Sequence, residues 1–151
     1  MRLIHFLRIF NSLNHEMRVL MIEAYFELCF ARIFKFLPLA KTSNYFGDYM
    51  EETPFITKSS DEKILKRISE AIHIMSRHTF WESQCMVKAI AGMRMLKKRQ
   101  IDCTIYFGTG KDESGKMCAH AWLRSGSYYI SGEEEKHRFT VVGKFAKNVQ
   151  R

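Results

Sequence analysis

Apolar residues recur at intervals of three and four in the first part of the chain, which is typical of an amphipathic helix. Asn14 is a suitable N-cap for this helix, with Glu16 in its first turn, and Pro38 marks its end. The apolar face consists of Val19, Ile22, Phe26, Phe30, Ile33 and Leu37. The pattern leaves open whether the N-terminal helices bind the core, a partner or a membrane, although we expect residues 1–10 to pack against the protein.

Two further helices are predicted after a connector at residues 39–58. The sequence Ser59-Ser60-Asp61-Glu62 is a capping-box pattern, and the helix after it places on one face Ile64, Ile68, Ile72 and Met75. The third helix extends from about residue 82 to residue 99. Its apolar face consists of Cys85, Ala89, Gly92, Met93 and Leu96.

The hydrophobic period then changes from helical to alternating. This alternation predicts strands at residues 103–107 and within 117–124, 127–130 and 139–145. Helices followed by a meander of strands predict an α+β protein with an antiparallel sheet. We expect an N-terminal helical region and connector at 1–58 and a core at 59–151, joined as one continuous domain.

Composition agrees with an ordinary globular protein. Of the 151 residues, 46% are hydrophobic and 26% are charged, which argues against wholesale disorder. The 24 Lys and Arg against 16 Asp and Glu give a net charge of +8, and most of this surplus lies in residues 81–151. The charge indicates an acidic partner. We expect no nucleic-acid partner, because no recognition motif accompanies the charge and the basic run at 97–99 suits a helix end.

The chain has four cysteines without CxxC spacing or the density of a disulfide scaffold, namely Cys29, Cys85, Cys103 and Cys118. His5 and Arg8 interrupt the apolar N-terminus, so that no secretory signal is predicted. The longest apolar region, residues 19–39, contains four charged side chains, which an ordinary membrane span does not tolerate. We therefore expect a reduced, cytoplasmic protein without membrane association.

Two residues suggest nucleophilic catalysis. Cys85 lies in the first turn of its helix, where unpaired N–H groups and the positive end of the dipole favour a thiolate. A cysteine on an apolar face is otherwise simply a core residue. His120 lies on an alternating strand and shares a face with Cys118 and Trp122. A cysteine at a helix start and a histidine on a later strand are the nucleophile and base of papain-type catalysis.

Such a pair usually needs a third group that orients the imidazole. In the hairpin after His120, a two-residue turn at either 125–126 or 126–127 puts Ser131 and Glu133 on the face of His120. A three-residue loop would reverse this parity. Glu133 is therefore the candidate third catalytic residue.

Four segments of the second half carry a family pattern, namely Trp81-Glu82-Ser83-Gln84-Cys85-Met86-Val87, Leu96-Lys97-Lys98-Arg99-Gln100-Ile101, Ile105-Tyr106-Phe107-Gly108 and Ala119-His120-Ala121-Trp122-Leu123. Together they resemble the core of the transglutaminase-like superfamily and, more narrowly, the lasso-peptide maturation peptidases. The resemblance includes the N-terminal helix and covers nearly the whole chain. It implies N-terminal helices beside a papain-like core in which the Cys helix packs on the antiparallel sheet.

The resemblance also implies a function. It implies an ATP-independent bacterial cysteine protease that removes the leader from a ribosomally synthesised lasso-peptide precursor, without a metal or other cofactor. A separate ATP-dependent macrolactam synthetase then cyclises the freed core peptide. In many bacteria the maturation protein is split, and this chain resembles the catalytic half, which implies a small leader-recognition protein in trans.

One position departs from the family pattern. The family triad is Cys-His-Asp, with the Asp about a dozen residues after the His, but this chain has Gly132 there and no Asp after Asp112. Either Glu133 substitutes, or a backbone or amide group orients His120, or the alignment shifts in this loop.

Two neighbours of the pair complete the candidate site. Gln84 precedes the nucleophile much as in transglutaminases, although we favour a role as a polar residue at the helix start. The backbone N–H of Cys85 is the expected oxyanion donor. Trp122 is either a wall that shields His120 from water or a core aromatic residue.

Three alternatives remain open. An acyl transferase would pass the same acyl-enzyme to an amine rather than to water. A metal site would use Cys118 and His120 with Cys85 or Cys103, although four ligands at a recognisable spacing are missing. A non-catalytic maturation or interaction module would explain why the third residue of the triad is missing.

Overall fold

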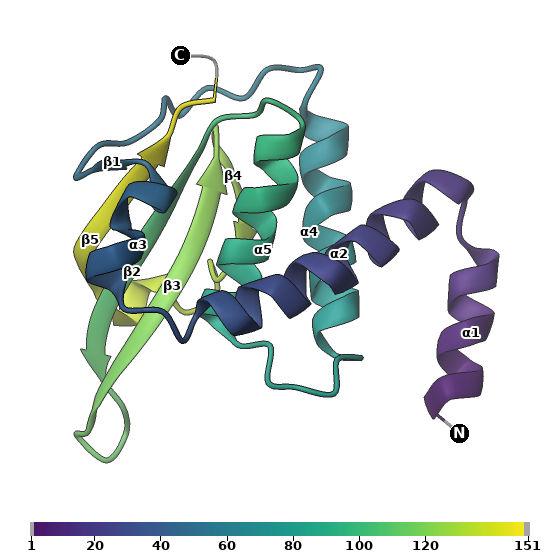
Figure 1. Cartoon of the computed structure of the whole chain (residues 1–151), viewed down its shortest axis with the longest axis horizontal. Coiled ribbons are helices and arrows are strands. Elements are labelled where there is room, and N and C mark those ends of the chain that lie inside the picture. The colour runs from purple at the N-terminus through teal and green to yellow at the C-terminus, as the bar shows by residue number, and fades with distance from the viewer. Residues whose placement is uncertain (1, 150–151) are drawn as a thin grey trace.

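A computed structural model of the protein describes residues 2–149 and combines helices with one sheet (Figure 1). The helices are α1 (Arg2–Ser12), α2 (His15–Phe34), α3 (Leu39–Phe46), α4 (Glu62–Ser76), α5 (Cys85–Lys98) and the short 3-10 helix η1 (Lys136–Arg138). The strands are β1 (Asp48–Tyr49), β2 (Cys103–Lys111), β3 (Met117–Ser125), β4 (Tyr128–Ser131) and β5 (Thr140–Lys147). This arrangement confirms the predicted α+β class with an antiparallel sheet.

The five strands form one antiparallel sheet in the order β1-β5-β2-β3-β4. Strands β2 and β3 form a long hairpin that pairs from Thr104 opposite Arg124 to Lys111 opposite Met117. Strand β4 pairs only with residues 123–125 of β3. The first part of β3 therefore extends beyond the stretch that β4 covers.

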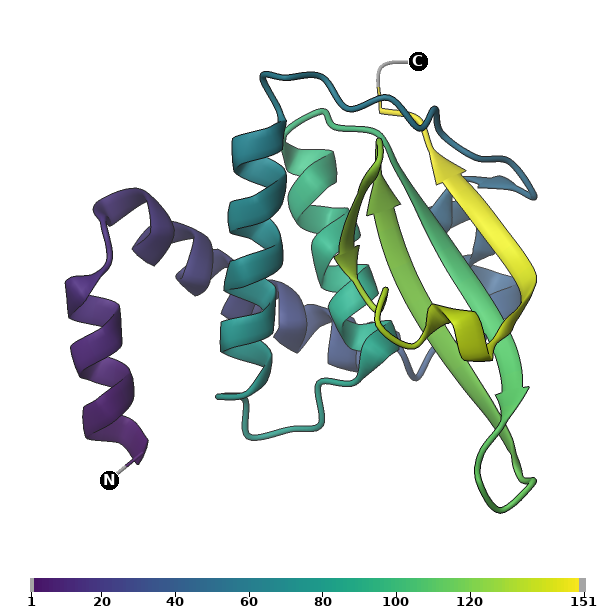
Figure 2. The ribbon, with the colours of Figure 1, turned by 180° about the vertical axis from the view of Figure 1, so that it is seen from behind.

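The helices form two layers on one side of the sheet. Helices α4 and α5 contact the sheet directly, and α2 crosses their outer side (Figures 1 and 2). The side chains between these layers are fully buried, among them Met21, Leu28, Ile68, Ile72, Ile90, Leu96 and Ile105. Burial stabilises the fold by about 1.5–3 kcal/mol for each such side chain.

The predicted connector at residues 39–58 was wrong in part, because it contains α3 and β1. Helix α2 ends at Phe34, before the predicted stop at Pro38, and Pro38 serves instead as the N-cap of α3. Phe46 at the end of α3 is fully buried and contacts the rings of Phe107 and Phe145. Packing on the sheet therefore stabilises a helix that is too short for a clear periodic signal.

Helix α2 begins after Asn14, whose side chain accepts a hydrogen bond from the N–H of Met17 at 2.9 Å, as the predicted cap requires. The predicted apolar face of this helix does not form the contact with α4 and α5. That contact uses the opposite face, which consists of Met17, Leu20, Met21, Ala24, Glu27, Leu28 and Ala31. The small side chains of Ala24 and Ala31 allow the close approach of the neighbouring helices. Within residues 2–149, no helix is both long and apolar enough to cross a bilayer.

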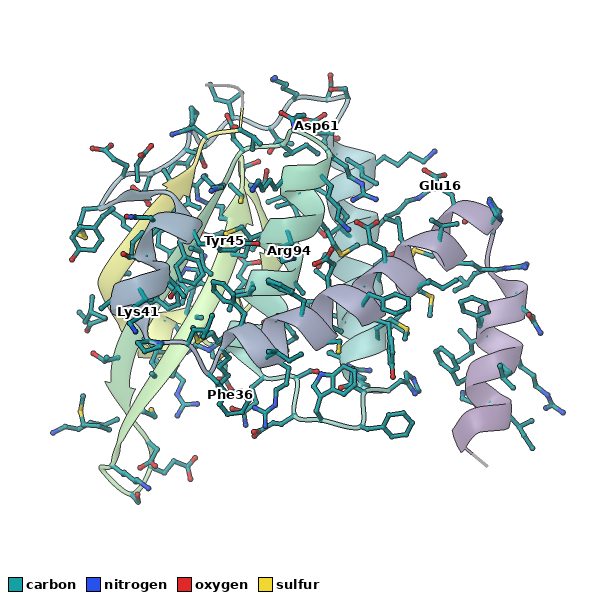
Figure 3. The ribbon with its side chains drawn as sticks, viewed as in Figure 1. Glu16, Phe36, Lys41, Tyr45, Asp61 and Arg94 are labelled. Atoms are coloured by element: carbon teal, nitrogen blue, oxygen red, sulfur yellow. The ribbon has the colours of Figure 1, made fainter. Side chains whose placement is uncertain are left out.

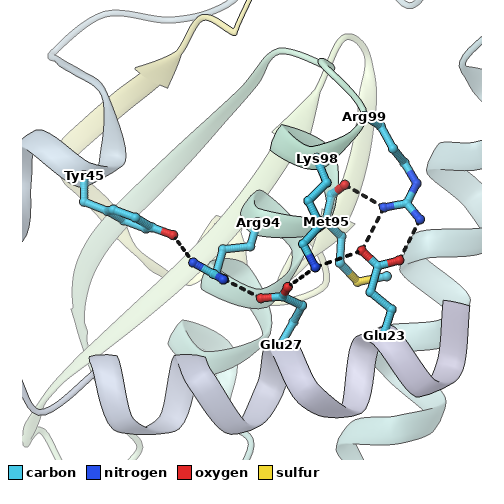
Figure 4. A network of polar contacts seen from close by, with 7 residues as sticks. All are labelled: Glu23, Glu27, Tyr45, Arg94, Met95, Lys98 and Arg99. Atoms are coloured by element: carbon cyan, nitrogen blue, oxygen red, sulfur yellow. Dashed lines mark hydrogen bonds and ion pairs between the residues drawn. The ribbon is translucent and has the colours of Figure 1, made fainter.

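A charged network joins α2 to α5 (Figure 4). Glu27 is only 4% exposed, and its carboxylate pairs with Arg94 and, at 2.6 Å, with Lys98. Glu23 accepts two hydrogen bonds from Arg99, at 3.0 and 2.6 Å. Arg94 also donates to the hydroxyl of Tyr45 on α3, at 2.6 Å. Lys98 and Arg99, predicted only as a helix end, thus fix α2 on the core, and Arg94 fixes α2 and α3.

Candidate functional site

Cys85 is the first residue of α5 and is partly exposed. Its helix begins after Gln84, whose side chain makes no capping hydrogen bond and instead donates to Glu82. The N–H groups of the first turn therefore have no side-chain partner at the cap. Cys85 thus lies at the start of its helix, as the sequence predicts, next to these N–H groups.

The segment before α5 is held on the helical layer. The hydroxyl of Thr79 is within 2.8 Å of the hydroxyl of Ser83 and donates to the carbonyl of Trp81 at 2.9 Å. The Trp81 ring lies 5.4 Å from the ring of Tyr25 on α2. These contacts fix the point at which α5 starts, and with it the position of Cys85.

His120 lies on β3 and is only 8% exposed. Its Nε2 lies 2.8 Å from the backbone carbonyl of Gly132, and its ring stacks between Trp122 and Phe139 at 5.7 and 4.9 Å. A carbonyl oxygen can only accept, so the proton of a neutral His120 is on Nε2. The Nδ1 atom then has its lone pair available to accept a proton.

Gly132 allows this contact because it has no side chain. Its φ of +79° lies in the left-handed region, and a Cβ at this position would lie 2.6 Å from the carbonyl oxygen of Ala121. A side chain would therefore displace the turn that brings the carbonyl to His120. The third group beside His120 is thus a backbone carbonyl, one of the alternatives that the sequence leaves open.

Two hairpin neighbours differ from the expected placement. The turn has Gly126 and Ser127 between the paired residues 125 and 128, but a bulge between Leu123 and Arg124 shifts the register. Ser131 consequently lies opposite Leu123 rather than on the face of His120, so that prediction was wrong. The structure does not bring Glu133 to His120 either. Glu133 is exposed, and its carboxylate lies 3.4 Å from the ammonium group of Lys136.

Trp122 belongs to a stack of aromatic side chains that orients His120. The ring of Trp122 is 4% exposed and lies parallel to that of Tyr106 at 5.5 Å. The hydroxyl of Tyr106 accepts a hydrogen bond at 2.9 Å from Arg124, which is fully buried. Burial, together with a hydrogen bond to Glu52, raises the pKa of Tyr106 to about 12. Strand alternation identifies Trp122 as a candidate, but no sequence pattern assigns a role to Phe139, Tyr106 or Arg124.

Cys85 and His120 lie at the same end of the layered structure but on different faces of the sheet. Gly92 of α5 lies against Leu123, and α5 and β3 run in the same direction (Figure 1). Seven helical residues and three strand residues each span about 10 Å, which places Cys85 level with His120. Side chains alternate along β3, so His120 points away from the face on which α5 packs. Among residues 2–149, no hydrogen bond links the Cys85 thiol to His120.

The remaining cysteines do not form a comparable site. Cys118 shares the face of His120, because both residues pair with alternate residues of β2. Burial raises the pKa of the Cys103 thiol to about 12, and the nearby charge of Asp102 acts in the same direction. In the part of the chain that the structure describes, no three His, Cys, Asp or Glu side chains are grouped as metal ligands would be.

Comparison with known proteins gives one match. Residues 35–144, more than half of the chain, match the family described as the Transglutaminase-like superfamily. No curated protein and no solved structure matches the chain. The matched residues include α5, β3 and the turn at Gly132.

Proposed function

Because the chain belongs to the transglutaminase-like superfamily, we propose that it is a cysteine peptidase that removes the leader from a lasso-peptide precursor. Enzymes of this superfamily are generally cysteine proteases or acyl transferases. The observation that most supports the proposal is the hydrogen bond from Nε2 of His120 to the carbonyl of Gly132, which leaves Nδ1 as a base. The thiol of Cys85, at the start of α5, is the proposed nucleophile.

In the proposed reaction, the Cys85 sulfur attacks the scissile carbonyl carbon while its proton passes to Nδ1 of His120. The backbone N–H of Cys85 donates to the oxyanion of the tetrahedral intermediate. The C–N bond then breaks, and the leaving amine takes the proton from Nδ1. Water attacks the thioester while Nδ1 accepts its proton, the C–S bond breaks, and the released thiolate takes that proton from Nδ1.

The reaction requires the thiol of Cys85 to reach His120 past the end of β4. This strand ends at Ser131, so on the β4 side no strand pairs with the first part of β3. Catalytic hydrogen bonds often become short only when substrate is bound. We therefore propose that the precursor, held by a separate leader-recognition protein, brings the two groups together. The ATP-dependent synthetase would act on the released core peptide.

A second candidate is acyl transfer, which the same superfamily supports. The acyl-enzyme on Cys85 would be identical, but an amine would replace water as the acceptor. The two reactions differ in mass: hydrolysis adds one water across the cleaved bond, whereas transfer to an amine adds the acceptor to the acyl fragment.

The proposal is tested by incubating the chain with a leader-containing lasso precursor, with and without the leader-recognition protein of the same system. Mass spectrometry should detect separate leader and core fragments whose masses sum to that of the precursor plus one water. His120→Gln should reduce the cleavage rate at least about a hundredfold, because the proton acceptor is removed. The control His137→Gln changes an exposed residue of η1 and should cleave at the wild-type rate. Equal rates for all three proteins would refute the role of His120.

A further inference from the structure

The N-terminal helices expose a broad apolar surface that the proposed reaction does not use. Eleven large apolar side chains between residues 4 and 39 are exposed. Five of them form one row on α2, which we call the α2 stripe: Val19, Ile22, Phe26, Phe30 and Ile33. Phe26 and Ile33 are each 67% exposed. The stripe is about 21 Å long, and soluble domains rarely expose a continuous apolar surface of this kind without a binding role.

The carboxylates of α2 are all neutralised by other helices. Glu16 pairs with Arg67 of α4, and Glu23 and Glu27 pair with basic residues of α5. The remaining acidic side chains of the chain lie after residue 47. Within residues 2–47, every carboxylate is therefore paired with a basic side chain of another helix.

The basic side chains between residues 8 and 41 have no such partners. Among the described residues, the following form no ion pair with a carboxylate: Arg8, Arg18, Arg32, Lys35 and Lys41. Arg32 lies over the ring of exposed Phe36 at 5.0 Å, and Lys41 lies near the same end of α2 as Phe36 (Figure 3). The stripe is thus bordered by uncompensated positive charge.

We propose that the α2 stripe and its basic border bind the surface of an anionic lipid membrane. A second copy of the chain is a poor occupant, because two such surfaces would bring like charges together. An amphipathic helix with large apolar residues on one side and Lys or Arg at its edges instead suits the boundary between acyl chains and anionic headgroups. The long basic side chains extend to the phosphates while the apolar row enters the boundary.

The layered fold allows this orientation. Helix α2 lies on the outer side of α4 and α5, away from the sheet (Figures 1 and 2). A membrane in contact with α2 would therefore leave the opposite side of the sheet, with His120 and the turn at Gly132, facing water. Binding is along the surface, which agrees with the finding that no helix among residues 2–149 can span a bilayer.

Flotation with lipid vesicles tests the proposal. The full chain should float with vesicles of equal parts phosphatidylcholine and phosphatidylglycerol, and bind at least tenfold less to vesicles of phosphatidylcholine alone. The double variant Phe26→Asn and Ile33→Asn should reduce binding to the anionic vesicles at least tenfold. The control variant Ile56→Asn and Phe80→Asn changes residues that are 82% and 94% exposed outside the stripe, and should bind like the wild type. Unchanged far-ultraviolet circular dichroism establishes that each variant is folded.

Charge variants measure the contribution of the basic border to binding separately from that of the apolar row. Arg32→Gln with Lys35→Gln should weaken binding to the anionic vesicles several-fold, whereas Lys111→Gln with Lys116→Gln, at the tip of the β2–β3 hairpin, should not. Failure of the wild-type chain to float with anionic vesicles overturns the proposal. So does equal loss in the stripe and control variants. Stripe-dependent dimers by light scattering, or stripe-dependent binding to an acidic protein without vesicle binding, would assign this surface to that partner instead.

Discussion

At the scale of single residues, His120 is oriented by a backbone carbonyl, whereas the Cys-His-Asp triad of the lasso-peptide maturation peptidases uses a carboxylate. The carbonyl of Gly132 fixes the proton on Nε2, and the rings of Trp122 and Phe139 fix the plane of the imidazole. A neutral carbonyl stabilises an imidazolium less than a carboxylate does. The site therefore relies on accurate placement of Gly132 rather than on a charge.

Gly132→Ala should destabilise the fold by about 1–3 kcal/mol and reduce peptidase activity at least tenfold, because the added methyl group displaces the carbonyl from His120. Gly115→Ala is the matched control. Gly115 also has positive φ, at +80°, but a Cβ there contacts nothing within 4 Å. Thermal unfolding of Gly115→Ala should show only the loss of stability that a side chain causes at positive φ, and this variant should retain activity. Equal activity losses in the two variants would contradict the positioning role of Gly132.

Glu133→Gln should leave the cleavage rate within about twofold of the wild type. The Glu133 carboxylate is exposed and lies beside Lys136, so its removal weakens only a surface ion pair. Chromatography of the precursor measures the initial cleavage rates of the variant and the wild type. A loss of tenfold or more would mean that Glu133 reaches His120 during the reaction.

The sequence predicts where the candidate residues lie on their helix and strand better than their mutual geometry. The start of α5 near Cys85 and the shared face of His120, Cys118 and Trp122 follow from periodicity and are confirmed. The bulge beside Leu123 has no sequence signal of its own, and one shifted residue is enough to reverse the face of Ser131.

At the scale of elements, α2 illustrates the limit of hydrophobic periodicity. The helix has apolar residues on two opposite faces, and the pattern of large side chains selected the exposed one. The buried face depends on Ala24, Ala31 and the neutralised carboxylate of Glu27, which a scale of hydrophobicity ranks below Phe and Ile. Close packing and ion pairing between helices therefore determine which face is buried, and neither is visible in one helix alone.

The charged network between α2 and α5 should make stability depend on pH. The pKa of Glu23 is lowered: burial alone would raise it, but hydrogen bonds and charge from Arg99 and Lys98 outweigh burial. A carboxyl group whose pKa is lower in the folded state stabilises the fold above its ordinary value of 4.5, and this stabilisation is lost as pH falls through the folded pKa.

Glu23→Gln should therefore lower the free energy of unfolding by about 1–2 kcal/mol at pH 7 and by much less at pH 3. Urea unfolding at the two pH values measures the difference. The control Glu113→Gln, at the exposed tip of the β2–β3 hairpin, should change little at either pH. A pH-independent effect of Glu23→Gln would show that the carboxylate charge does not stabilise the contact.

At the scale of the whole molecule, the sequence predicts the α+β class and the antiparallel sheet, because both follow from local periodicity and short hairpins. The predicted meander is wrong for the last strand, because β5 does not follow β4 in the sheet but returns to lie between β1 and β2. That pairing joins residues about 100 positions apart, such as Asp48 and Ala146, and has no local signal. The two helical layers likewise arise only when α2 crosses α4 and α5. The result is a molecule with its candidate catalytic groups at one end and the exposed apolar stripe of α2 on its outer side.

The central claim, that Cys85 is the nucleophile of a leader peptidase, is tested most directly by comparing two cysteine variants on one precursor. Cys85→Ala should abolish cleavage while leaving thermal unfolding unchanged, because Cys85 is partly exposed at a helix start. Cys118→Ala, another partly exposed cysteine on the face of His120, should cleave at the wild-type rate. Cleavage by Cys85→Ala at the wild-type rate would contradict the account.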